Sequence, residues 1–252
     1  MEIITSRKNQ HIQMFRALAA QRSARREQGL FVCDGEKLLG EALANEAELG
    51  EILVREGQTV PTVSGIPVYS VEESVFSYAS PLENSPGPLF TVHIPAVRLP
   101  EALRKVILLE NVQDPGNVGT VLRSAAALGV DCVILCGECA DPYQPKVVRG
   151  TMGAIFRQNL WLTDIRTAAA QCRKWELPLY GAALTPSAVD VRSVPLRPAA
   201  VAVGNEGHGL SAEMLSLCDA QLIIPMTPGS ESLNAAVAAS LLMWEMSRNG
   251  EG

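Results

Sequence analysis

The spacing of apolar residues along the first part of the chain predicts alternating helices and strands. Ile12, Phe15 and Leu18 recur at helical spacing and predict a helix over residues 5–26. Short apolar runs predict strands at 30–35, 51–54, 67–70 and 89–94, with helical patterns between them at 36–47 and 72–79. This alternation is typical of an α/β layer.

The alternation restarts after a proline-containing stretch at residues 94–105, which reads as a connection between two domains. The later strands are predicted at 105–109, 132–136, 159–162, 177–184, 199–204 and 221–225, and the later helices at 117–128, 146–154, 164–175, from 211 and over 232–248. A parallel sheet wrapped by helices is the simplest arrangement for this order. We therefore predict an α/β protein with a first domain over 1–94, a linker over 95–104 and a second domain over 105–252.

The composition agrees with a soluble α/β protein. Hydrophobic residues make up 47% and charged residues 19% of the 252 positions. No stretch reaches the roughly 18 continuous apolar residues that a membrane helix needs, and the first residues lack the apolar core of a signal peptide. We therefore expect a cytoplasmic protein with no membrane partner.

Three of the six cysteines stand close together at Cys132, Cys136 and Cys139. Their C-x3-C-x2-C spacing fits an iron–sulfur cluster that cleaves S-adenosylmethionine into a radical. The same residues also read as a buried strand in which free cysteines act as small apolar side chains. No other metal site is expected, because the three histidines (His11, His93 and His208) are scattered along the chain.

The distribution of charge singles out the N-terminal segment. The net charge of −6 argues against general attraction to nucleic acid. Residues 1–40, however, hold seven basic and four acidic side chains. This excess fits a phosphate-binding surface, and it fits a solvated amphipathic helix equally well.

The first polar segment that follows a predicted strand is residues 114–123, DPGNVGTVLR. Asp114 or Asn117 can cap the following helix. Gly119 stands one helical turn before Arg123, which leaves space beside the guanidinium at the start of the helix. Such an arginine is well placed to bind a phosphate or another anion.

Two further segments also combine glycine or proline with polar residues after a strand. In residues 201–211, three glycines surround Glu206, and Ser211 can cap the next helix. In residues 223–240, a Pro/Gly turn leads through Ser232 and Asn234 into a helix of small apolar residues, which is also typical of a dimer interface. Neither segment carries the G-x-G-x-x-G or P-loop pattern of nucleotide-binding proteins.

Taken together, the three segments resemble the motifs of the SpoU/TrmH family of RNA ribose 2′-O-methyltransferases. The first is similar to D-P-x-N-x-G-x-x-x-R, the second to G-N-E-x-x-G-L, and the third to I-P-M followed by S-L-N. Residues 141–156 resemble the family's segment between the first two motifs. The N-terminal half resembles the small ribosomal-protein-like RNA-binding domain of many members.

The resemblance implies a fold, a reaction and a set of site residues. The second domain would contain a deep trefoil knot and bind S-adenosylmethionine, and the protein would methylate a ribose in structured ribosomal or transfer RNA as a homodimer. The cofactor would contact Gly204, Ile224, Met226, Ser232 and Leu233. The catalytic residues would be Asn117, Arg123, Glu206 and Asn234. RNA would contact Arg7, Lys8, Arg22, Arg25, Arg26 and Arg149. Two alternatives stay open, which are the radical enzyme built on the three cysteines and an RNA-binding protein of this fold that has lost activity.

Overall fold

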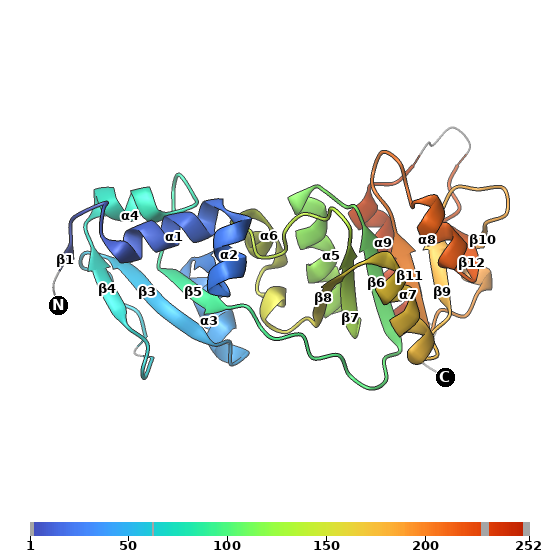
Figure 1. Cartoon of the computed structure of the whole chain (residues 1–252), viewed down its shortest axis with the longest axis horizontal. Helices are drawn as coiled ribbons and strands as arrows, with labels where there is room; N and C mark the ends of the chain where they lie inside the picture. The colour runs from blue at the N-terminus through green and yellow to red at the C-terminus, as the bar shows by residue number, and fades with distance from the viewer. Residues whose placement is uncertain (1–2, 62, 228–231, 249–252) are drawn as a thin grey trace. The chain divides into compact units, whose positions relative to one another are not determined.

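The chain is described by a computed structural model that covers residues 3–61, 63–227 and 232–248. The chain forms two compact units (Figure 1), which are Met1–Ala96 with Asp141–Phe156 (unit 1) and Val97–Ala140 with Arg157–Gly252 (unit 2). The sequence predicts a single uninterrupted domain from residue 105 onward, so the assignment of residues 141–156 to unit 1 is a difference between expectation and structure.

Unit 1 is a mixed five-stranded sheet with helices. Its strands, in spatial order, are β1 (Ile3–Ile4), β4 (Val68–Val71), β3 (Leu49–Arg55), β5 (Leu89–His93) and β2 (Leu30–Asp34). Its helices are α1 (Gln10–Ala20), α2 (Arg22–Gln28), α3 (Glu36–Ala44), α4 (Glu73–Ala79), α6 (Pro145–Thr151) and the short 3-10 helix η1 (Ala154–Phe156). Ile12, Phe15 and Leu18 of α1 pack with Phe76 of α4 in one buried cluster, as the helical spacing of the first three predicts.

The helix predicted over residues 5–26 is in fact two helices, α1 and α2. Asn9 begins α1 by accepting a hydrogen bond from the backbone N–H of His11 at 2.9 Å. Gln21 then has extended backbone angles and separates the two helices. The guanidinium of Arg25 in α2 folds back and donates to the carbonyl of Leu18 at 2.6 Å, which satisfies an oxygen at the end of α1.

Residues 141–156 pack against the edge strand β2 of unit 1. The ring of Phe31 in β2 lies 5.1 Å from the ring of Tyr143 and 6.4 Å from that of Phe156. The guanidinium of Arg25 holds the carboxylate of Asp141 in a buried ion pair at 2.6 Å. These contacts join two parts of the sequence more than a hundred residues apart, which explains why the pattern along the chain does not predict them.

Unit 2 is built on a seven-stranded sheet in which every strand pair is parallel. Its strands, in spatial order, are β10 (Val189–Asp190), β12 (Ala220–Ile223), β9 (Leu179–Ala182), β11 (Ala199–Val203), β6 (Lys105–Glu110), β7 (Cys132–Cys136) and β8 (Leu160–Thr163). Every residue of β6, β7 and β11 is buried, as expected for the central strands of a sheet covered on both faces.

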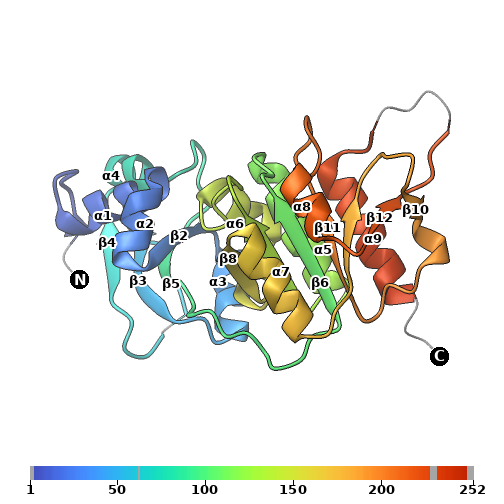
Figure 2. The same ribbon diagram turned by 45° about the vertical axis from the view of Figure 1, so that its right-hand side comes forward.

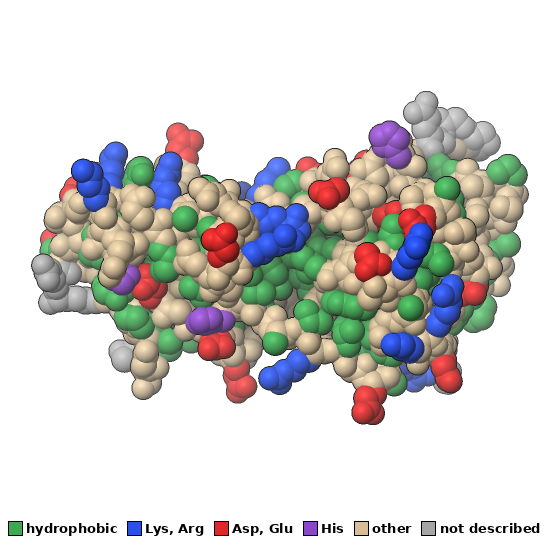
Figure 3. Space-filling model, in the orientation of Figure 1, with side chains coloured by type: hydrophobic (Ala, Val, Ile, Leu, Met, Phe, Trp, Pro, Cys, Tyr) green, Lys and Arg blue, Asp and Glu red, His purple; other side chains and the backbone are tan. Residues whose placement is uncertain are grey.

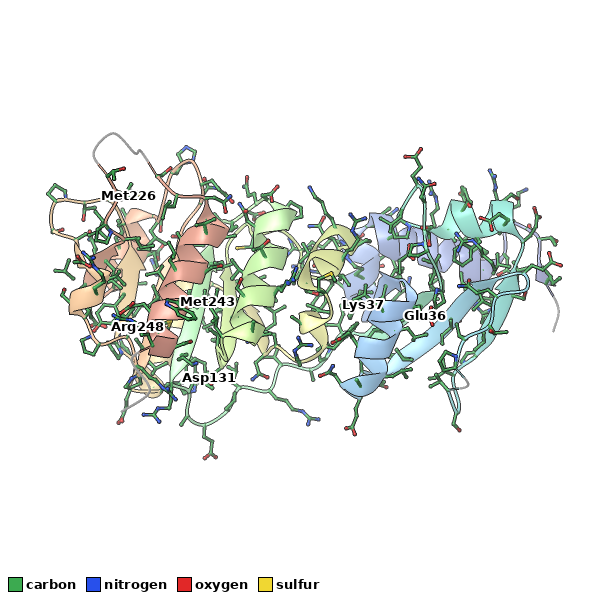
Figure 4. All side chains as sticks on the ribbon, turned by 180° about the vertical axis from the view of Figure 1, so that it is seen from behind. Glu36, Lys37, Asp131, Met226, Met243 and Arg248 are labelled. Atoms are coloured by element: carbon green, nitrogen blue, oxygen red, sulfur yellow. The ribbon has the colours of Figure 1, made fainter. Side chains whose placement is uncertain are left out.

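Helices cover both faces of this sheet. They are α5 (Pro115–Ala127), α7 (Ile165–Lys174), α8 (Ala212–Leu217), α9 (Ala235–Arg248) and the short 3-10 helix η2 (Val191–Ser193). Figures 1 and 2 show α7 and α8 on one face, and the view from behind in Figure 4 shows α5 and α9 together on the other. In the part of the chain that the structure describes, none of the helices has the length and apolar character to cross a membrane.

The order of the strands determines where a ligand can bind in unit 2. The chain runs from β6 outward to β7 and β8, and later inserts β11 between β6 and β9. The strands β6 and β11 are neighbours in the sheet. The connection after β6 leads to β7 on one side of this pair, whereas the connection after β11 leads to β12 on the other side. Ligands in open parallel sheets bind at such a divergence, beyond the carboxyl ends of the strands.

Candidate active site

Three side chains from three distant segments are hydrogen-bonded to one another beyond the carboxyl ends of β6, β11 and β12. The amide nitrogen Nδ2 of Asn117 donates to Oε1 of Glu206 at 2.5 Å. Nδ2 of Asn234 donates to Oδ1 of Asn117 at 3.0 Å. Asn117 thus links the other two side chains, and the structure brings together three of the four residues predicted to be catalytic.

The start of α5 fixes the position of Asn117. Asp114 is the N-cap, and its Oδ1 accepts the backbone N–H of Asn117 at 2.9 Å. Pro115 occupies the first helical position, where its missing N–H costs no hydrogen bond. The cap is therefore Asp114, one of the two residues that the sequence offered.

The loop that carries Glu206 is held in place by Asn205 and by close backbone contacts. Nδ2 of Asn205 donates to the backbone carbonyl of Asn111 at 2.9 Å, which ties this loop to the end of β6. The backbones of Asn205 and Gly209 exchange two hydrogen bonds, at 3.1 and 2.9 Å. A Cβ on Gly204 would lie 2.2 Å from the carbonyl carbon of Gly209, so only glycine at position 204 permits this closure.

Two helix starts complete the arrangement. Oγ of Ser211 accepts the N–H of Met214 at 3.0 Å and caps α8, as predicted from the sequence. The buried carboxylate of Glu110 accepts the N–H of Ser211 at 2.9 Å, which fastens the end of the loop to β6. Oδ1 of Asn234 accepts the N–H groups of Ala236 and Val237, at 2.9 and 3.2 Å, at the start of α9. Asn234 is thus oriented by its own helix.

A cavity of about 490 Å³ opens beside Glu206. Its lining includes all five residues predicted to bind the cofactor, Gly204, Ile224, Met226, Ser232 and Leu233. Met226 marks this end of unit 2 in Figure 4. A volume of this size is within the range that holds a cofactor, and the aliphatic side chains around the polar rim suit an adenine ring. The residues present therefore fit S-adenosylmethionine.

Sequence analysis misses one part of this cavity. Ala183, Leu184 and Thr185, directly after β9, also line it. The signal was present, because residues 183–187 also combine a strand end with threonine, proline and serine. The sequence predicts a strand over 177–184, and its end marks this fourth segment.

Arg123 is the predicted catalytic residue that stays apart. It lies on α5 with an exposed side chain. Among the residues that the structure describes, no hydrogen bond connects its guanidinium to Asn117, Glu206 or Asn234. Its exposed guanidinium is available for a ligand that arrives from solution.

The residues predicted to bind RNA all belong to unit 1, and they differ in exposure. Arg7, Lys8, Arg26 and Arg149 are exposed, and Arg22 is half-buried. Arg25 is only 4% exposed, and its guanidinium contacts Asp141 and the carbonyl of Leu18. The prediction that Arg25 binds RNA is therefore corrected, because its donors point into the protein.

Comparison with known proteins identifies relatives of both units. The model of the SpoU rRNA Methylase family matches residues 104–244, and that of the MRM3-like substrate binding domain matches residues 9–89. The 23S rRNA (guanosine(2553)-2′-O)-methyltransferase RlmP of Bacillus subtilis is 33% identical over 98% of this chain and 99% of its own length.

Solved structures cover the whole chain. An rRNA methyltransferase from Sinorhizobium meliloti superposes with a TM-score of 0.88 at 27% identity, over 100% of this chain and 99% of that one. An AdoMet-bound rRNA methyltransferase structure from the same organism gives a TM-score of 0.86 at 26% identity with the same coverage. These likenesses confirm the α/β fold class predicted from the sequence, and the trefoil knot stays what the resemblance implies.

The radical-enzyme alternative is wrong. Cys132 and Cys136 are buried in β7, and burial raises the pKa of each thiol to about 12. Burial likewise raises the pKa of Cys139 to about 11, and its Sγ donates to the carbonyl of Leu109 at 3.3 Å. A cluster is bound by thiolates, whereas these groups are held as thiols in the core. The relatives are SpoU-type RNA methyltransferases and not radical enzymes.

Proposed function

Because this chain belongs to the SpoU rRNA methylase family, we propose that it methylates a ribose 2′-hydroxyl in ribosomal RNA. It is an RNA 2′-O-methyltransferase that uses S-adenosylmethionine. The choice of ribosomal over transfer RNA is supported by the B. subtilis relative, whose name specifies 23S rRNA. The N-terminal match to a substrate-binding domain supports RNA recognition by unit 1.

The observation that carries this proposal is the hydrogen-bonded group of Asn117, Glu206 and Asn234 at the rim of the cavity. Two amides and one carboxylate are suited to hold a sugar hydroxyl, because together they offer both donors and acceptors. Their three segments are fixed by helix caps and by the closed loop at Gly204. A site held in this way can position the ribose without rearrangement during the reaction.

The cavity would bind the cofactor, and the polar group would bind the ribose. When bound, S-adenosylmethionine supplies an electrophilic methyl group to an attacking oxygen. Gly204, Ile224 and Leu233 would enclose the cofactor, and the polar group beside them would face the ribose. Oε1 of Glu206 is engaged by Asn117, which leaves Oε2 able to accept a hydrogen bond from the ribose hydroxyl.

Arg123 serves this reaction best as a phosphate clamp. A guanidinium stays protonated in proteins and is a poor proton acceptor. Its planar donors match a phosphate in bidentate fashion, and its exposed position leaves them available to the RNA backbone. The proton of the 2′-hydroxyl would then pass to Glu206, to a substrate phosphate or to water.

The proposal is tested by methyl transfer from radiolabelled S-adenosylmethionine to purified ribosomal and transfer RNA of a strain that lacks the gene. We expect label in 23S rRNA, at a position that resists alkaline cleavage because its 2′-oxygen is blocked. Label in transfer RNA alone would overturn the choice of substrate. Cofactor binding without transfer to any RNA would favour the alternative of a protein that has lost activity.

We also propose that α9 forms a homodimer interface. Val237, Leu241 and Trp244 are 47%, 44% and 59% exposed and recur at helical spacing along one side of α9. A stripe of large apolar side chains on one helix can pair with its own copy across a two-fold axis. The stripe starts three residues after Asn234, so a second copy bound there would lie close to the candidate active site.

A further inference from the structure

The buried ion pair between Arg25 and Asp141 brings two basic helices together in unit 1. Arg25 belongs to α2, and Asp141 lies four residues before α6. Nε and Nη2 of Arg25 both donate to Oδ2 of Asp141, at 2.8 and 2.6 Å. The contact is closed to solvent, since the side chains are 5% and 10% exposed. One of the three arginines of α2 is thus used to fasten α6 beside it.

The other basic residues of the two helices are at least partly exposed. In α2 these are the half-buried Arg22 and the exposed Arg26, which stand four residues apart and so share a side of the helix. The helix also carries one exposed acidic residue, Glu27. In α6 the basic residues are Lys146 and Arg149, three residues apart on the side opposite the buried Val147 and Val148. Figure 3 shows Lys and Arg side chains gathered where Figure 1 places α2 and α6.

No acidic side chain neutralises these four cations in the described part of the chain, where none of them forms an ion pair. Asp34 lies near Arg149 at a small cavity, but its carboxylate accepts hydrogen bonds from Ser80, Ser85 and the N–H of Gly87. Nε of Arg22 is buried without a partner. Like charges on neighbouring helix positions destabilise the free protein, and bound anions would remove that cost.

We propose that Arg22, Arg26, Lys146 and Arg149 form one RNA-backbone-binding surface, called here the α2–α6 surface. In this arrangement Arg25 does not contact the RNA. Its ion pair with Asp141 holds α2 and α6 next to each other. Guanidinium groups bind phosphates in bidentate fashion, which favours the phosphodiester backbone over a base edge. The inference rests on the proposed function for the identity of the anion.

The α2–α6 surface goes beyond the domain that the comparisons connect with the substrate. The substrate-binding family model ends at residue 89, and α6 falls inside the stretch matched by the methylase model. The structure nevertheless assigns residues 141–156 to unit 1. RNA recognition would therefore draw on a part of the sequence that belongs, by sequence comparison, to the catalytic domain.

The test compares two neutralised variants of the full-length protein. Lys146→Gln/Arg149→Gln removes two charges from the α2–α6 surface, and Arg173→Gln/Lys174→Gln removes two exposed charges from the end of α7 as a matched control. The probe is a fluorescein-labelled transcript of 23S rRNA that contains the position named in the B. subtilis relative. Binding is measured by anisotropy between about 50 and 300 mM KCl.

Each lost phosphate contact should lower the slope of log K against log salt by about 0.7–0.9. For two contacts we expect a slope smaller by about 1.5 and a dissociation constant roughly 15–30-fold higher at about 0.15 M salt. The control should match the wild type. Arg26→Gln tests the α2 half in the same way, with about half of the change in slope.

Equal slopes for Lys146→Gln/Arg149→Gln and the control would overturn the inference, provided that the wild type binds and methylates the transcript. A wild type that binds S-adenosylmethionine but neither binds nor methylates any RNA would overturn the proposed function itself. Circular dichroism of both variants checks that they are folded. Exposed glutamine substitutions leave the buried Arg25–Asp141 pair intact, so a loss of binding cannot be assigned to unfolding.

Discussion

Replacing Asp141 with alanine should destabilise unit 1, because it leaves the guanidinium of Arg25 buried without a counter-charge. The pair is 5% and 10% exposed, and two charged hydrogen bonds at 2.8 and 2.6 Å join it. Breaking a buried pair from one side costs about 3–5 kcal/mol. The lost acceptor for the N–H of Tyr143, at 3.1 Å, adds to this cost.

The double variant Arg25→Met/Asp141→Leu separates the charge effect from the packing effect. With both charges gone, no charged group is left buried and unpaired, and apolar replacements of a buried pair are often close to neutral. The remaining losses are the hydrogen bond to the carbonyl of Leu18 and the one from the N–H of Tyr143, each worth about 1 kcal/mol, and the second is lost in the single variant as well. The double variant should therefore recover at least about 2 kcal/mol relative to Asp141→Ala.

The assay must report on unit 1 alone, since two units need not unfold together. Amide hydrogen exchange of β2 and α1 in increasing urea measures unit 1. The fluorescence of Trp161, Trp175 and Trp244, all in unit 2, gives an internal control that should not change. If the β2 amides of Asp141→Ala keep wild-type protection, or if the double variant is as unstable as the single one, the reasoning from the buried charge is refuted.

Four further predictions concern unit 2. Arg123→Ala should bind S-adenosylmethionine with unchanged affinity in calorimetry while the transfer rate falls by about 10²–10³-fold; an equal loss of both would contradict the phosphate-clamp role. Burial raises the pKa of Cys132, Cys136 and Cys172 to about 12, so native protein at pH 8 should resist iodoacetamide at these thiols. Because unfolded thiols ionise near pH 9, the folded state should lose stability as the pH rises from 9 toward 12, and unchanged urea midpoints at pH 8 and 10.5 would contradict this. Trp244→Glu should convert the proposed dimer to a monomer in sedimentation velocity, and a dimer that persists would place the interface elsewhere.

The sequence predicts much of the site because the strands of unit 2 are parallel. Carboxyl ends of parallel strands share one edge of a sheet, so segments that follow different strands can meet there. Asn117, Glu206 and Asn234 are brought together in this way. Their mutual hydrogen bonds, by contrast, depend on helix caps and loop closure that no spacing along the chain specifies.

The errors arise where a distant partner decides the outcome. Nothing near Arg25 in the sequence distinguishes it from Arg22 and Arg26, and its counter-ion stands 116 positions away. The break at Gln21 has a more local basis, since Arg25 donates to the carbonyl of Leu18, seven residues before it, at the end of α1. Local patterns find the elements, and contacts between distant residues decide which charge is buried.

The insertion of β11 beside β6 has a consequence for synthesis of the chain. Val106 pairs with Ala200, so β6, an interior strand of the sheet, lacks one neighbour until that later stretch has left the ribosome. At roughly 5–20 residues per second, the delay is about 5–20 seconds. During that interval a strand with four consecutive apolar residues, Val106 to Leu109, presents an open edge to other nascent chains, and early engagement by a chaperone would favour correct assembly.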